Sequence, residues 1–154
     1  MTDRLINFTL NGEAVSATVK PYHNLIDLLS QFDLRGARES CGQGLCGCCT
    51  VIMDGEAVSG CLSFAVRADG KSLSTIEYLE QDGELSAIQK AFIDAGALQC
   101  GFCTSGFILM TKELLKRNPN PTDEEIRDYL SGNLCRCGTY PEVIEAVKAA
   151  ARSQ

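Results

Sequence analysis

Nine cysteines in a chain of 154 residues constrain this protein more than any other feature of its sequence. They form two groups, separated by residues 62–99, which contain none. The groups are Cys41, Cys46, Cys48, Cys49 and Cys61, and then Cys100, Cys103, Cys135 and Cys137. A chain of this length holds one ordinary domain or two small ones, so two groups suggest one site per domain. A disulfide framework, a zinc site and an iron–sulfur cluster are all chemically possible.

The rest of the sequence favours metal binding over disulfides. The first residues, MTDRLINFTLNGEAV, follow a polar strand pattern without the apolar core of a signal peptide. No apolar run approaches the roughly 20 residues of a membrane span. We therefore expect a cytoplasmic protein with no membrane contact, in which thiols stay reduced. A net charge of −6 argues against nucleic acid or an anionic membrane surface as partner.

The N-terminal half has the pattern of a β-rich unit crossed by one helix. Asn11-Gly12 is typical of a type I′ hairpin turn, because both turn positions need positive φ. Asn24 can cap a helix running through residues 25–32. The expected strands lie at residues 4–10, 13–19, 50–53, 56–59 and 73–76.

From about residue 84 the pattern becomes helical, after a polar and acidic stretch at residues 77–84 that we take as the linker. Four helices are expected to form a small bundle. Leu85, Ile88, Phe92 and Ile93 recur at helical spacing, and Gly96 ends that helix. The other three are a helix over residues 105–118, one started by a Thr122–Glu125 capping box, and one with Pro141 in its first turn.

The first cysteine group has the spacing of a plant-type 2Fe–2S site. Cys41, Cys46 and Cys49 form C-x4-C-x2-C, and Cys61 follows after eleven residues. Zinc sites more often use two C-x2-C turns. Glycines between the cysteines let backbone N–H groups turn toward an anionic cluster. Adjacent Cys48 and Cys49 cannot easily both point at one cluster, and the spacing selects Cys49, so Cys48 is expected to be a packed thiol.

The second group is C-x2-C followed by C-x-C. Each pair precedes an expected helix, and helix N-termini favour anionic groups through their free N–H donors. A second 2Fe–2S cluster fits this arrangement. Zinc also fits the number of thiols.

Together, ESCGQGLCGCCTV with Cys61, and QCGFC with GNLCRC, resemble the small iron–sulfur subunit of molybdenum hydroxylases of the xanthine oxidase family. The resemblance covers nearly the whole chain. It implies an α+β fold with a β-grasp, plant ferredoxin-like 2Fe–2S domain over residues 1–78. A helical 2Fe–2S-binding domain, a four-helix bundle, would occupy residues 79–154.

The resemblance also implies a function. The chain would be the electron-transfer subunit of a multi-subunit molybdenum-dependent oxidoreductase, without turnover or catalytic residues of its own. Electrons would pass from molybdopterin in a large subunit, through both clusters, to FAD in a medium subunit or to another acceptor. A dimer of heterotrimers is the expected assembly. A stand-alone two-cluster ferredoxin and a zinc-stabilised interaction module are the alternatives.

Individual positions take their expected roles from the same resemblance. The flavin-side cluster ligands would be Cys41, Cys46, Cys49 and Cys61; the molybdenum-side ligands would be Cys100, Cys103, Cys135 and Cys137. Gln99 matches a glutamine that hydrogen-bonds the pterin across the subunit interface, and Cys137 matches the point of closest approach. There are three departures from the family pattern: Ser105 replaces a common proline, CRCGTY replaces CRCTGY, and Cys48 replaces a small residue.

Overall fold

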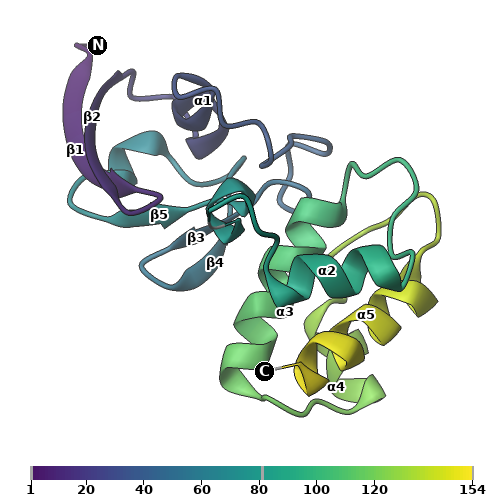
Figure 1. The fold of residues 1–154 in the computed structure, drawn as a ribbon. Coiled ribbons are helices and arrows are strands. Elements are labelled where there is room, and N and C mark those ends of the chain that lie inside the picture. Colours follow the sequence, from purple (N-terminus) through teal and green to yellow (C-terminus); the bar gives the residue numbers. More distant parts are fainter. Residues whose placement is uncertain (1, 81, 154) are drawn as a thin grey trace.

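The computed structural model describes residues 2–80 and 82–153, which form a sheet-containing half and a helical half (Figure 1). The strands are β1 (Arg4–Leu10), β2 (Glu13–Val19), β3 (Thr50–Met53), β4 (Glu56–Ser59) and β5 (Ser72–Ser74). They make one mixed sheet in the order β2-β1-β5-β3-β4, in which only the β1–β5 pair is parallel among the described residues. The predicted strands are confirmed, except that the last begins one residue earlier and ends two residues earlier than expected.

Local turn and cap signals in the N-terminal half are confirmed. Asn11 and Gly12 have φ values of 52° and 86°, as a type I′ turn requires. The Asn11 side chain also accepts a 2.9 Å hydrogen bond from the backbone N–H of Thr75, so the hairpin tip is tied to the end of β5. Asn24 caps α1 (Leu25–Ser30) by accepting the backbone N–H of Ile26 at 2.8 Å. This helix ends two residues earlier than predicted.

Four helices make up the second half, as predicted. They are α2 (Ala87–Asp94), α3 (Thr104–Arg117), α4 (Asp123–Tyr129) and α5 (Tyr140–Arg152). The expected α2 pattern was wrong in detail: Leu85 precedes the helix, and Ile93 is 54% exposed. The helix starts at Ala87, because the N-cap residue Ser86 forms a capping box with Gln89 that satisfies N–H groups of the first turn.

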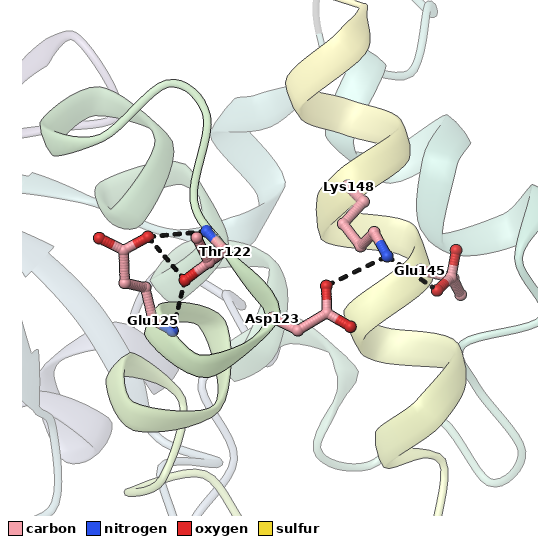
Figure 2. A network of polar contacts seen from close by, with 5 residues as sticks. All are labelled: Thr122, Asp123, Glu125, Glu145 and Lys148. Atoms are coloured by element: carbon pink, nitrogen blue, oxygen red, sulfur yellow. Dashed lines mark hydrogen bonds and ion pairs between the residues drawn. The ribbon is translucent and has the colours of Figure 1, made fainter.

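The predicted start of α4 is also confirmed, and this end of the helix is joined to α5. Glu125 accepts the backbone N–H and the hydroxyl of Thr122 at 2.7 and 2.9 Å (Figure 2). Lys148 of α5 lies 3.1 Å from a carboxylate oxygen of Asp123 and 3.4 Å from one of Glu145. The first turn of α4 is therefore held against α5 by charge as well as by packing.

The two halves are not independent. α3 packs against β3 and β4, and one buried apolar cluster combines Cys46, Cys48 and Ile52 with side chains of the helices. A second buried cluster lies within the sheet half, between the sheet and α1. In the described residues, we find no helix whose length and apolar character would let it cross a membrane.

Two short 3₁₀ segments, η1 (Ala65–Ala68) and η2 (Ile76–Leu79), were not predicted. The second overlaps the start of the expected linker, where Leu79 is buried in the cluster shared with the helices.

Candidate metal centres

The first cysteine group lies on the loop between α1 and β3, with Cys61 just after β4. The sulfur of Cys41 accepts backbone N–H groups from Gln43 at 3.3 Å and from Leu45 at 3.4 Å. These two donors lower the pKa of Cys41 to about 6. Each donor follows a glycine with positive φ, Gly42 at 63° and Gly44 at 70°. As predicted, the glycines turn the loop amides toward a sulfur, which favours the thiolate that a metal needs.

Two other expected ligands of this group, Cys49 and Cys61, lie beside each other. The backbone N–H of Cys61 donates to the sulfur of Cys49 at 3.5 Å, and the two thiols are in contact. Burial raises the pKa of the Cys49 thiol to about 11. Such a thiol loses its proton only when a cation replaces it, which couples metal binding to proton release.

Cys48 is the one cysteine of this group that is not an expected ligand. Its thiol is buried in the cluster shared with the helices, and its sulfur lies 3.9 Å from the carbonyl oxygen of Cys46. Burial raises the pKa of Cys48 to about 12. Cys103 is buried in the same cluster with a similarly raised pKa, so it is the C-x4-C-x2-C spacing that separates Cys48 from the expected ligands.

The second cysteine group closes around the N-termini of two helices. The sulfurs of Cys100 and Cys137 are 3.6 Å apart, and the thiol of Cys103 contacts that of Cys135. Cys103 is the residue before the first turn of α3, and α5 begins three residues after Cys137. Burial raises the pKa of Cys103 to about 12.

Thr139 and Tyr140 hold Cys135 in place, and the sequence did not indicate either contact. Burial acts to raise the pKa of Cys135, but the hydroxyl and backbone N–H of Thr139 outweigh it and lower the pKa to about 7. The Thr139 oxygen lies 3.2 Å from the sulfur, and the Tyr140 hydroxyl accepts the Cys135 N–H at 2.9 Å. The CRCGTY order makes this possible, because Gly138 turns the chain at φ 81° and Thr139 becomes buried. A hydroxyl-bearing residue four positions after Cys135 was the signal available in the sequence.

The thiols therefore meet in pairs, and this tests which metal group they fit. The pairs are Cys41 with Cys46, Cys49 with Cys61, Cys100 with Cys137, and Cys103 with Cys135, and Cys46 also neighbours the thiol of Cys48. Over residues 2–80 and 82–153, no three Cys, His, Asp or Glu side chains are arranged to hold one metal ion. A structural zinc ion needs four donors around one point. A 2Fe–2S cluster has two irons and takes four thiolates in all, so paired thiols fit it better.

The second site is open to the surface on one side. Gln99 and Cys100 are exposed and Cys137 is half-buried. Phe102 and Leu134 beside them are 42% and 52% exposed. An apolar rim of this kind around a candidate redox site is typical of a surface that a partner covers.

Family comparisons agree with this donor chemistry in both halves. Residues 8–79 match the family of 2Fe–2S iron–sulfur cluster binding domains, and residues 75–148 match a second family described as the 2Fe–2S binding domain. The nicotinate dehydrogenase small FeS subunit of Eubacterium barkeri is 48% identical over 146 residues, which cover 94% of this chain and 93% of that one. The chain belongs to the small 2Fe–2S subunits of the xanthine dehydrogenase family of molybdenum hydroxylases.

Two further members of this small-subunit family support the assignment. The xanthine dehydrogenase iron–sulfur-binding subunit of Escherichia coli O157:H7 is 41% identical, with 92% of this chain and 91% of that chain covered. The crystal structure of quinoline 2-oxidoreductase from Pseudomonas putida 86 superposes with a TM-score of 0.95 at 40% identity, covering 98% of this chain and 95% of that one. The expected fold, a ferredoxin-like domain followed by a helical domain, is thereby confirmed.

The predicted function is confirmed at the same level. This small subunit is an iron–sulfur electron-transfer component of a multi-subunit molybdenum-dependent oxidoreductase, with two 2Fe–2S domains. The stand-alone ferredoxin and the zinc-stabilised module are disfavoured, because relatives over the full length are named as dehydrogenase subunits.

Proposed function

We propose that eight of the nine thiols are cluster ligands and that Cys48 is not. The first 2Fe–2S cluster would be held by Cys41, Cys46, Cys49 and Cys61, and the second by Cys100, Cys103, Cys135 and Cys137. The observation that carries this proposal is the meeting of these eight thiols in four pairs. Cys48 also neighbours Cys46, and the C-x4-C-x2-C spacing selects Cys49 in its place. The first centre would belong to a domain of residues 1–78 and the second to a domain of residues 79–154.

Within each site, the chain's own groups would prepare the sulfurs for an anionic cluster, which supplies one-electron transfer when bound. The N–H groups of Gln43 and Leu45 would stay directed at Cys41, and the Thr139 hydroxyl would donate to Cys135. Buried Cys46 and Cys103 limit the access of water to each site. Hydrogen bonds to sulfur and exclusion of water are both factors that set a cluster's potential.

The exposure of the second site at the protein surface supports electron transfer from the second site to the first. We infer that the large molybdopterin-binding subunit covers the exposed side of the second site, with Gln99 hydrogen-bonded to the pterin and Cys137 nearest to it. Exposure of Gln99 and half-burial of Cys137 support this placement. Electrons would then reach the first site and leave toward FAD in a medium subunit or toward another acceptor.

The proposed complex is a dimer of heterotrimers in the cytoplasm, where the nine cysteines, none of which forms a disulfide, would stay reduced. Co-purification from native cells, with mass identification of the partners, tests this assembly. The subunit alone should hydroxylate nothing, because no substrate site is proposed on it. Turnover by the isolated chain would contradict the electron-relay role.

Metal analysis tests the ligand assignment directly. Two 2Fe–2S clusters predict about four irons and four inorganic sulfides per chain, with little zinc. Two distinct paramagnetic signals should appear after reduction, because the two sites differ in fold and hydrogen bonding. Stoichiometric zinc in the second site would overturn the two-cluster proposal.

A further inference from the structure

The segment before the first cysteine loop is hydrogen-bonded to both cysteine loops. The backbone N–H of Arg38 donates to the carbonyl oxygen of Cys48 at 3.0 Å. Its guanidinium donates to the carbonyl oxygen of Gly101 at 2.7 Å. Two residues earlier, the carbonyl oxygen of Gly36 accepts the hydroxyl of Ser105 at 2.6 Å. One short segment of the sheet half is thus hydrogen-bonded to the QCGFC loop of the helical half and to the first turn of α3, which follows that loop.

Arg38 brings an unneutralised positive charge to that loop. The side chain is half-buried, and the guanidinium carbon lies 5.6 Å from the ring centre of Phe102. The ion pairs found among residues 2–80 and 82–153 do not include Arg38. Gly101 and Phe102 are the two residues between Cys100 and Cys103, so the charge is held beside the turn that carries two proposed ligands.

This placement has an electrostatic consequence for a bound cluster. Reduction adds one electron to a group that is already anionic, and a fixed positive charge stabilises the reduced form more than the oxidised form. The charge therefore raises the reduction potential. A partly buried guanidinium that stacks on a ring and donates to a carbonyl is better held than a flexible ammonium.

We propose that Arg38 is a positioning residue for the second centre, which fixes the Cys100–Cys103 turn and raises the potential of the cluster bound there. The proposal rests on the ligand assignment made above. Arg136 also stands between two proposed ligands, but its side chain is exposed, so water and salt screen its charge more strongly.

Redox titration of the complete complex, followed by electron paramagnetic resonance, tests this role. In Arg38→Gln, at a fixed solution potential, the ratio of reduced to oxidised second cluster should fall about tenfold, which is 59 mV for a one-electron couple. The first cluster should titrate as in wild type. Arg35→Gln is the matched control. It also removes one positive charge, three residues before Arg38, but the Arg35 side chain is exposed and forms an ion pair with Asp33. Both clusters of the control should titrate unchanged.

Arg38→Lys separates charge from simple support. It keeps the positive charge, so the ratio of reduced to oxidised second cluster should stay within about twofold of wild type. This test remains valid even if Arg38→Gln loses iron from the second site. A tenfold fall in the lysine variant would overturn the charge effect. An unchanged second cluster in an iron-replete Arg38→Gln would overturn the proposal as well. Absence of two cluster signals in wild type would instead contradict the ligand assignment itself.

Discussion

The backbone N–H of Leu134 donates a 3.0 Å hydrogen bond to the carbonyl oxygen of Cys46. Leu134 directly precedes Cys135, so this bond joins a proposed ligand of the first centre to the neighbour of a proposed ligand of the second. Beside it, the amide of the buried Asn133 donates to the carbonyl oxygen of Gly47 at 3.5 Å. The two cysteine loops thus form the joint between the halves, and changes at the joint should be felt at both sites.

Gly106 on α3 tests how closely the halves approach at this joint. A Cβ atom at this position would lie 2.1 Å from the carbonyl oxygen of Gly47, which is backbone and cannot rotate away. Gly106→Ala should therefore destabilise the protein by about 1–3 kcal/mol, although alanine is the better helix former. Denaturant unfolding measures this. Gly132→Ala is the control, since its Cβ would meet nothing within 4 Å. If the two variants had the same free energy of unfolding, α3 and the first cysteine loop could move apart here without destabilising the protein.

Cys48 and Cys49 should respond in opposite ways to the same substitution. Cys48→Ala should keep the full iron content, because this thiol contributes packing in the shared apolar cluster. Cys49→Ala should lose the first cluster and destabilise the N-terminal half, because metal binding is coupled to folding. Iron analysis of both purified variants decides the point. Similar iron loss from both variants would contradict the assignment of Cys49, and not Cys48, as the ligand.

The Thr139 hydroxyl should tune the second cluster through its contact with Cys135. Thr139→Val keeps the shape of the buried side chain but removes the group that lies 3.2 Å from the sulfur. A cluster that loses a hydrogen bond to sulfur has a lower potential, so the second signal should titrate at lower potential while iron content is unchanged. Thr104→Val, a half-buried change in the first turn of α3, is the control. An unaltered second signal in Thr139→Val would exclude a hydrogen bond from this hydroxyl.

Gln99→Ala tests the proposed contact with the pterin. Both clusters should assemble normally, because Gln99 is exposed and is not a proposed ligand. A neutral hydrogen bond contributes about 0.5–1.5 kcal/mol, so its loss should slow reoxidation of molybdenum or shift its potential without dissociating the complex. Rapid-mixing kinetics on the reconstituted complex measure the transfer step. Wild-type kinetics together with a wild-type molybdenum potential would rule out the contact.

The capping box of α4 gives a prediction with a pH dependence. Thr122→Ala should lower the free energy of unfolding by about 1 kcal/mol at neutral pH. The backbone N–H of Thr122, and then its hydroxyl, lower the pKa of Glu125, so the cap stabilises the fold above the carboxyl's unfolded pKa. That part is lost as pH falls through the lower folded pKa. The difference in the free energy of unfolding between Thr122→Ala and wild type should therefore become smaller at acid pH. Ser131→Ala, an exposed substitution just after α4, should show no such difference at either pH.

The sequence alone determined the features that depend on neighbouring residues. The Asn11-Gly12 turn, the Asn24 and Thr122 caps and the ligand spacing of the first loop each involve a few consecutive positions. Backbone preferences and side-chain-to-backbone hydrogen bonds act at that range, so they can be predicted from sequence. Apolar spacing was less reliable in α2, where Ile93 proved exposed and the Ser86 cap set the helix start.

Tertiary structure decided which distant groups meet. The parallel pairing of β1 with β5, the contact of Cys100 with Cys137 across 37 positions, and the bond from Arg38 to Gly101 across 63 leave no local signal. Nor does a glycine at position 106 show that a carbonyl from residue 47 lies against it. These contacts form because α3 packs on β3 and β4 and brings both cysteine loops to one joint, a result of burial over the whole chain.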